Sequence, residues 1–147
     1  MRLPWSWAEQ RLIDARNYWI VTTRPSSRPH ARPVWGVWLD NAFWFSTGSM
    51  AHANLCSNAD ITVHLESGSQ VVIVEGTASL VTDRAAIERV VDAYNPKYSW
   101  EMDADALPGP FWRVEPALVF GWLSDDSGID GGAVFLSTAT RWRFGSG

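Results

Sequence analysis

The chain has little of several residue types, and each shortage excludes something. Cys56 is its only cysteine, so it cannot form an internal disulfide bond. Lys97 is its only lysine among 12 basic residues, so a cationic site for an anion must use arginine, histidine, hydroxyl or backbone N–H groups. No stretch has the ~20 apolar residues of a membrane-spanning helix or the apolar core of a signal peptide. We therefore expect a cytoplasmic protein with no membrane partner.

Motifs that mark common enzyme classes are also missing. The glycine patterns of dinucleotide-binding and P-loop proteins do not occur, nor does the G-x-S-x-G of serine hydrolases. His52 and Cys56 have metal-ligand spacing on a helix, but only His30 and His64 could complete such a site. We therefore expect no metal site, and the sequence assigns no catalytic residue.

The composition indicates one folded domain over residues 1–147. Apolar residues make up 46% and charged residues 19% of the chain, which argues against disorder. The net charge of −4 excludes a generic nucleic-acid partner, because such a partner requires a basic surface. Residues 1–66 carry six arginines and five acidic residues, whereas residues 67–147 carry six basic and eleven acidic residues. An anionic ligand therefore suits the first half better, unless arginines near the C-terminus reach it.

Ten tryptophans are more than a core of this size needs. The indole N–H requires a partner when it is buried, so tryptophan is common at pockets and interfaces. We expect most of the tryptophans in the core, and the rest at a ligand pocket or in the interface of a homodimer.

Hydrophobic patterning predicts short strands with two or three helices, hence an antiparallel barrel decorated by helices. Ser6 and Glu9 have the spacing of a capping box, and Asn95-Pro96 predicts a helix end. Asp40-Asn41 predicts a type I′ hairpin turn, and Gly76 a bulge or close backbone approach. The predicted strands are 17–23, 30–39, 42–46, 61–66, 70–81, two halves of 111–123, and 139–144; the predicted helices are 6–15, 49–57 and 84–94; the predicted loops are 101–110 and 124–132.

The main candidate site lies in the stretch 30–66. Ser46-Thr47-Gly48 ends a strand and is followed at once by a helix, so free backbone N–H groups and the positive end of the helix dipole face one point. Such a point favours an anion, although the same residues are also ordinary turn formers. Pro33 removes a donor from mid-strand, which indicates either an edge strand or a strand that faces a ligand.

The order of these parts resembles the split β-barrel family of flavin- and deazaflavin-binding oxidoreductases related to pyridoxamine-phosphate oxidase. The H-x-x-P-V-W pattern at 30–35 is similar to the family strand that lies along the tricyclic ring. Ser46-Thr47 is similar to the pair that contacts the ribityl phosphate. The resemblance implies a mainly β fold with helices, a six-stranded antiparallel split β-barrel. It also implies a homodimer with two cofactor sites at the subunit interface.

The sequence departs from the family pattern at Ala51. The family has a phosphate-binding lysine or arginine there, three residues before an Asn-Leu pair that matches Asn54-Leu55. Met50 precedes this position and His52 follows it. The resemblance therefore implies that His52 or an arginine from elsewhere replaces the missing cation, while the alternative for His52 is an ordinary surface residue.

Two further segments resemble the deazaflavin branch of the family, namely Lys97-Tyr98 and the T-R-W-R-F at 140–144. In that branch the final motif helps to form the pocket, so Arg141 is expected to reach the cofactor across the dimer. The implied function is an oxidoreductase that uses coenzyme F420 to transfer a hydride to or from a small organic substrate. The alternatives are FMN as cofactor, a non-catalytic F420 or flavin carrier, and a protein that has lost cofactor binding. The cofactor-binding candidates are His30, Pro33, Val34, Trp35, Ser46, Thr47, Met50, Ala51, His52, Asn54, Lys97, Arg141 and Trp142.

Overall fold

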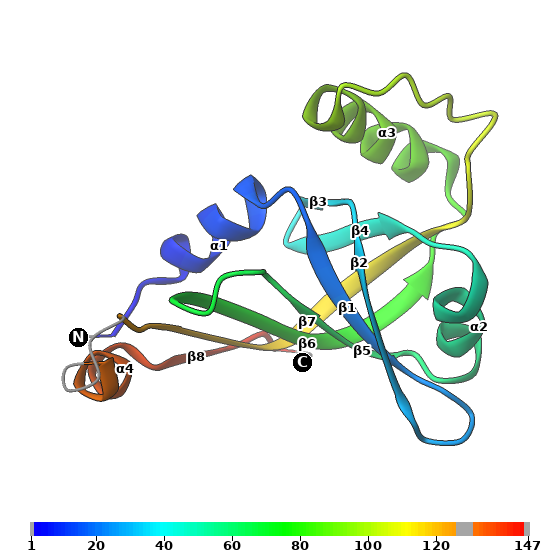
Figure 1. Ribbon diagram of the computed structural model, residues 1–147. Helices are drawn as coiled ribbons and strands as arrows, with labels where there is room; N and C mark the ends of the chain where they lie inside the picture. Colours follow the sequence, from blue (N-terminus) through cyan, green and yellow to red (C-terminus); the bar gives the residue numbers. More distant parts are fainter. Residues whose placement is uncertain (1, 126–130, 146–147) are drawn as a thin grey trace.

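Alternating burial turns one face of each strand toward a core. In β1 (Tyr18–Thr23) every second residue is buried and the residues between are half-buried. The computed structural model describes residues 2–125 and 131–145, which form one sheet of eight strands and four helices (Figure 1). The other strands are β2 (Pro29–Val34), β3 (Gly36–Leu39), β4 (Ala42–Ser46), β5 (Asp60–His64), β6 (Gln70–Leu80), β7 (Phe111–Leu123) and β8 (Thr140–Arg143). The helices are α1 (Trp5–Asp14), α2 (Ser49–Ser57), α3 (Arg84–Tyr98) and α4 (Gly131–Thr138).

The strands at the two edges of the sheet, β2 and β3, follow one another directly in the chain. The hydrogen-bonded order is β2-β1-β5-β6-β7-β4-β3, with β8 added to β7, and every pairing is antiparallel. The single strand predicted over 30–39 is interrupted at Trp35, because β2 pairs with β1 whereas β3 pairs with β4. If β2 and β3 are counted as one strand, they form the six strands of the expected split barrel together with β1, β4, β5, β6 and β7. β8 is then an additional strand.

Two local predictions are confirmed. Asp40 and Asn41 have φ angles of 55° and 56°, the left-handed conformation that a type I′ turn requires at both central residues. α2 spans the predicted range, from Ser49 to Ser57. The strand before α2 and the helix start after it are therefore where the sequence pattern placed them.

β7 is continuous through Pro116, so the prediction of two strand halves is wrong. Its register against β6 skips Ala117, because Glu75 pairs with Leu118 and Gly76 pairs with Pro116. A bulge of this kind lets a strand accommodate a proline without ending. A Cβ atom on Gly76 would lie 2.3 Å from the carbonyl oxygen of Glu115, so the predicted bulge and the predicted close approach both occur here.

Two predicted helix ends are wrong. α1 begins at Trp5 after Pro4, and it has no side-chain cap, so Ser6 lies inside the helix and does not form the capping box with Glu9. α3 continues through Pro96 to Tyr98. Pro96 removes only one hydrogen bond in the last turns, while the burial of Tyr98 stabilises the continuation.

The sequence pattern does not predict α4, because its first residues fall within the predicted loop 124–132. Its sequence begins with two glycines, which are poor helix formers, and so gives no start signal. The central part of that predicted loop, 126–130, and residues 146–147 lie outside the described residues. Among the described helices, none is long and apolar enough to cross a membrane.

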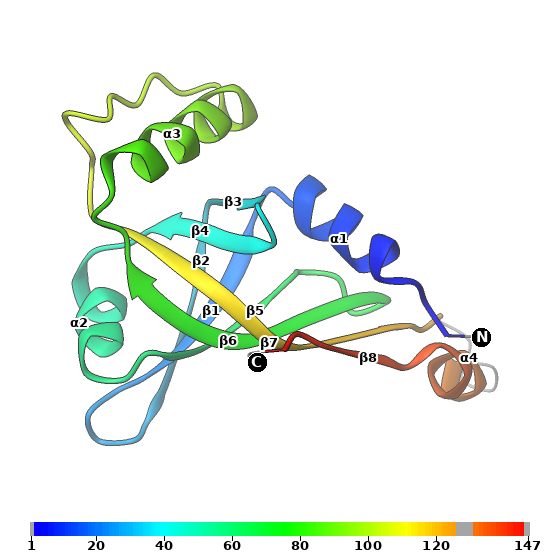
Figure 2. The ribbon, with the colours of Figure 1, turned by 180° about the vertical axis from the view of Figure 1, so that it is seen from behind.

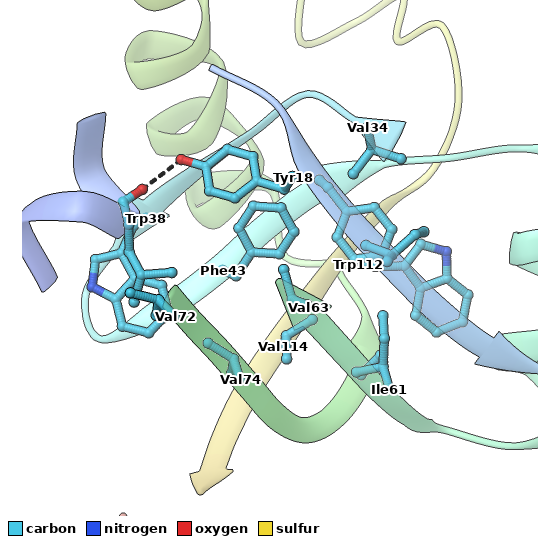
Figure 3. Packing of buried hydrophobic residues seen from close by; sticks show 14 of the residues in the cluster. Tyr18, Val34, Trp38, Phe43, Ile61, Val63, Val72, Val74, Trp112 and Val114 are labelled. Atoms are coloured by element: carbon cyan, nitrogen blue, oxygen red, sulfur yellow. Dashed lines mark hydrogen bonds between the residues drawn. The ribbon is translucent and has the colours of Figure 1, made fainter. Parts of the chain in front are cut away.

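The barrel encloses the larger of two apolar clusters. Figure 3 shows Tyr18, Phe43, Val63 and Val114 pointing toward one another from four different strands. The hydroxyl of Tyr18 donates a hydrogen bond of 2.5 Å to the carbonyl of Leu12 in α1. The buried hydroxyl is thereby satisfied, and α1 is fixed to the sheet.

The second cluster lies between α3 and the β3–β4 hairpin. Val90 and Tyr94 of α3 pack there with Trp44 and Phe111, and all four side chains are buried. Figures 1 and 2 show α3 standing beyond one end of the barrel, connected to β7 by the chain that follows it. This packing positions the 99–110 connection over the end of the barrel.

Gly76→Ala should lower the free energy of unfolding by about 1–3 kcal/mol, because the new methyl group must displace the backbone of β7. Gly68→Ala is the control, since a Cβ there meets nothing within 4 Å. Urea unfolding of both variants measures the difference. Equal effects at the two glycines would contradict the close-approach explanation.

Candidate functional site

A pocket of about 400 Å³ opens where β2 and β4 end and α2 begins. Four parts of the chain contribute to it: Asn17 before β1, the β2–β3 junction, the end of β4 with the start of α2, and α3 with the 99–110 connection. Its lining residues are Asn17, Arg32, Pro33, Val34, Trp35, Ser46, Thr47, Gly48, Tyr94, Trp100, Met102, Pro108 and Gly109. The structure thus brings together Pro33, Val34, Trp35, Ser46 and Thr47 among the predicted site residues.

One wall of the pocket is aromatic. Trp35 and Trp100 are 38% and 41% exposed, and among the tryptophans of the described residues they are the two exposed ones. Their rings meet edge to face with centroids 5.7 Å apart. The remaining tryptophans are buried or half-buried, as expected for most of them. Exposed indole faces in a concave site suit a flat ring.

The position of Trp35 is set from behind by α3. Its ring stacks on Tyr98 at 4.4 Å with an interplanar angle of 8°, and the Arg16 guanidinium lies 5.2 Å from the centroid of each ring. The N–H of Gly36 donates to the Tyr98 hydroxyl at 2.9 Å. That hydroxyl in turn faces the carbonyl oxygens of Arg16 and Gly36 at 2.7 and 2.9 Å. Trp35 therefore has a rigid support.

The opposite side of the pocket is polar. Thr47 is buried, and its hydroxyl donates only a long bond of 3.3 Å to the Gly48 carbonyl. Gly48 precedes α2 without a side-chain cap, so the first N–H groups of the helix have no capping side chain. Gly109 approaches so closely that a Cβ there would lie 3.2 Å from the Ser46 hydroxyl. The resulting arrangement of hydroxyl groups and a helix N-terminus favours an anion.

Arg32 is a pocket residue that the sequence analysis did not identify. It lies half-buried in β2, and its Nε atom is buried without a hydrogen-bond partner. A buried guanidinium N–H without an acceptor is unfavourable, which indicates a site for an anion or water. Strand alternation could have identified this residue, because Arg32 lies on the same face of β2 as Val34, which the sequence analysis names as a site residue.

Four of the predicted residues on α2 lie outside the pocket lining. Ala51 is completely buried in the barrel core, and Met50 is 46% exposed. Asn54 is buried and donates a 3.1 Å bond to the Thr22 hydroxyl, which ties α2 to β1. His52 accepts a 3.1 Å bond at Nδ1 from the indole N–H of Trp112, and its Nε2 lies 3.7 Å from the Cys56 sulfur. Both ring nitrogens of His52 therefore have protein neighbours.

Lys97 also lies outside the pocket lining. Its ammonium group donates to the Tyr18 hydroxyl at 2.7 Å and to the Gly36 carbonyl at 3.0 Å. Burial is the main reason why the pKa of Lys97 falls to about 8, with Asp14 opposing the shift and Arg16 adding to it. The lone lysine of the chain therefore joins α3 to the barrel behind Trp35.

Arg141 and Trp142 lie at the other end of β7. Arg141 pairs with Phe120 of β7, whereas Ser46, which lines the pocket, pairs with Phe111 of the same strand. At ~3.3 Å per residue, Phe120 and Phe111 are about 30 Å apart along β7. Trp142 packs edge to face on Trp5 with centroids 5.6 Å apart. Within one chain these two residues are therefore remote from the pocket.

The part of the chain that the structure describes contains no group of three or more histidine, cysteine, aspartate or glutamate side chains that could hold a metal ion. His30 is near the pocket, two residues from Arg32 on the same strand face, but it does not line it. His64 stacks on Trp19 with centroids 6.2 Å apart. The polar residues that line the pocket are thus Asn17, Arg32 and hydroxyl-bearing side chains, together with backbone groups.

The fold and the pocket together define a split-barrel protein with a site suited to a flat, anionic ligand. The sequence profile of the family described as pyridoxamine 5'-phosphate oxidase matches residues 8–123. The chain belongs to this family. No curated protein matches it at the sequence level.

Several solved structures share the fold. They include General Stress Protein 26 from Bacillus anthracis, with 17% identity, a TM-score of 0.66, and coverage of 79% of this chain and 91% of that one. A FAD-binding protein from Mesorhizobium loti has 19% identity, a TM-score of 0.64, and coverage of 80% and 92%. An F420 reductase has 17% identity, a TM-score of 0.58, and coverage of 75% and 94%. At these identities the similarity shows the fold alone.

Lys97→Met should change how stability depends on pH. The folded-state pKa of about 8 is below the ordinary 10.5, so between these values the unfolded wild type binds more protons than the folded protein. The wild type should therefore gain stability relative to Lys97→Met as the pH rises from 7 to 9.5, and lose that gain as the pH falls through 8. Urea unfolding at the two pH values measures this, and a pH-independent difference would contradict the assignment.

Proposed function

We propose that the pocket binds a tricyclic flavin-type cofactor and that the protein is an oxidoreductase acting on a small organic substrate. Coenzyme F420 is the cofactor that we favour, and FMN is the alternative. The observation that carries the proposal is the presence of two exposed indoles and the Arg32 side chain in one pocket. A flat ring that carries a phosphate-bearing chain needs both features.

The described residues fit such a group. Trp35 and Trp100 offer apolar surface for a ring, and Pro33 leaves the strand edge beside them without an N–H group. Arg32, Thr47 and the start of α2 offer donors for a phosphate. Ala51 lies outside the pocket lining and carries no charge where the family has its lysine, and Arg32 supplies a cation in the pocket instead.

When bound, a flavin or deazaflavin supplies the hydride-transfer chemistry. The protein would then contribute binding, orientation and exclusion of water. Trp35 is held by Tyr98 and Gly36, so its ring can define the plane of a bound ring. The pocket lining includes no aspartate, glutamate, histidine, lysine or cysteine, so Arg32 and Tyr94 are its only titratable side chains. Burial raises the pKa of Tyr94, which keeps it neutral.

The preference for F420 over FMN rests on similarity. The T-R-W-R-F motif and Lys97-Tyr98 resemble the deazaflavin branch, and an F420 reductase is among the proteins that share the fold. A FAD-binding protein shares the fold as well, which keeps the flavin alternative open. Titration of the protein with F420 and with FMN, followed by fluorescence, separates these two. Binding of neither would support a protein that has lost its cofactor.

Arg32→Gln should weaken cofactor binding by about 1.5–3 kcal/mol, because it removes a charged donor from the phosphate. Thr47→Ala should weaken it by about 1–3 kcal/mol for the same reason. Arg89→Gln is the control, since Arg89 is exposed on α3 and pairs with Asp40 outside the pocket. Calorimetric titration measures all three. Wild-type affinity in Arg32→Gln would leave the helix start after Thr47 as the main anion site.

We also propose a homodimer in which Arg141 reaches the pocket of the other subunit. Arg141 is exposed and contacts only the face of Phe120, at 5.7 Å, among the contacts described for it, so it is available to a partner. If it binds phosphate as a fork, Arg141→Lys should be nearly as harmful to cofactor affinity as Arg141→Ala. Titrations of both variants and sedimentation of the wild type measure this. A monomeric wild type, or unchanged affinity in Arg141→Ala, would end the assignment.

A further inference from the structure

Buried polar atoms without a partner gather on one hairpin. Within the described residues, the buried side-chain nitrogen and oxygen atoms that lack a hydrogen bond are Arg24 Nε, His30 Nδ1 and Arg32 Nε. All three belong to the hairpin of β1 and β2. Buried polar atoms normally have a hydrogen-bond partner. Three unpaired atoms on one hairpin therefore point to a shared cause more strongly than three scattered atoms would.

These side chains also share one face of the hairpin. Thr22 pairs with His30 and Ile20 pairs with Arg32, so His30 and Arg32 lie on the face that carries the buried residues of β1. The N–H of Arg24 donates to the Arg28 carbonyl at 3.0 Å, which continues the ladder by one step. By strand alternation, Arg24 and Arg28 therefore lie on that same face.

No acidic residue of the neighbouring sequence neutralises this face. Between Asp14 and Asp60 the chain has a single acidic residue, Asp40, and its carboxylate pairs with Arg89 of α3. Neither the hairpin nor α2 therefore carries a carboxylate. The hairpin thus has Arg24, Arg28, His30 and Arg32 and no carboxylate of its own, while Asp60 of β5 lies beside Thr23 on the opposite face.

The row of basic side chains leads away from the pocket. Arg32 lines the pocket, His30 lies about 7 Å further along β2, and Arg28 about 13 Å further, at ~3.3 Å per residue. Figures 1 and 2 both show the hairpin extending past the rest of the sheet, with α2 beside it. The bond from Asn54 to Thr22 holds α2 against the same hairpin.

We infer that Arg24, Arg28 and His30, the hairpin basic cluster, form a second anion subsite for the tail of the ligand that occupies the pocket. The inference rests on the proposed function, because the tail belongs to the same ligand whose first anionic group meets Arg32. The ligand class is then a cofactor with at least two anionic groups, separated by roughly 7–13 Å in the row geometry. The carboxylate tail of F420 can span this distance, whereas the second phosphate of a diphosphate lies directly beside the first. FMN, with one phosphate, leaves the subsite unused.

The test compares ligands that differ in their tails. Arg24→Gln/Arg28→Gln is titrated with FMN, with FAD and with F420 that carries several tail carboxylates, each at low and high salt. Arg89→Gln/Arg113→Gln is the control, because both arginines form ion pairs elsewhere on the molecule. We expect the affinity for a tail-bearing ligand to fall at least about tenfold and to lose part of its salt dependence, whereas FMN affinity changes less than about twofold. A loss for F420 that exceeds the loss for FAD supports the carboxylate tail, and a loss for FAD alone would overturn the stated spacing.

Two outcomes overturn the inference when the wild type binds a ring cofactor. One is an equal loss for FMN and for the tail-bearing ligands, and the other is no loss for any of them. Thermal unfolding of each variant checks that the fold is intact.

If the wild type binds no ring cofactor, the proposed function fails separately. Stabilisation by tripolyphosphate then decides the subsite. A rise in Tm that is present in the wild type and lost in Arg24→Gln/Arg28→Gln supports it, and equal behaviour overturns it.

Discussion

The change of strand partner at Trp35-Gly36 is the constraint on which the remaining structure depends. A Cβ on Gly36 would lie 2.3 Å from the ring of Phe43, so only glycine lets β3 pass so close to the core. The chain leaves β1 and joins β4 at this point, which closes the barrel and turns Trp35 out of the ladder. Lys97 and Tyr98 both bind the Gly36 backbone. Barrel closure, the position of α3 and the aromatic wall are therefore one structural unit.

This unit explains why the pocket depends on arginine. The only lysine of the chain is engaged behind Trp35 with Tyr18 and Gly36, and so it does not reach the pocket. Ala51 faces the barrel core, where a charged side chain would require desolvation without a partner. Arg32 lies on a strand instead of a helix, and its side chain lines the pocket. The one cation of the pocket lining is therefore on β2 and not on α2.

Local signals predicted much of the fold, and long-range contacts account for what they missed. The Asp40-Asn41 turn, the limits of α2 and the glycine at the bulge depend on a few neighbouring residues, and all were predicted. The passage of α3 through Pro96 depends on burial of Tyr98 against distant strands, which no local rule contains. Pro33, Val34 and Trp35 were identified from a motif, whereas Arg32 required the knowledge that its strand face meets the pocket.

The distribution of acidic residues connects the pocket with the way in which a ligand arrives. Sixteen acidic residues give the chain its negative charge, but the hairpin, the pocket strands and α2 contain almost none of them. Glu101, Asp103 and Asp105 lie in the connection that carries the pocket-lining Trp100 and Met102, so the side of the hairpin is the more favourable approach for an anionic ligand. Arg24, His30 and Arg32 bury nitrogen atoms that have no hydrogen-bond partner within the described protein, which is unfavourable for folding when no ligand is present. A ligand that supplies these partners would therefore stabilise the hairpin as well as fill the pocket, which couples the order of β1 and β2 to binding.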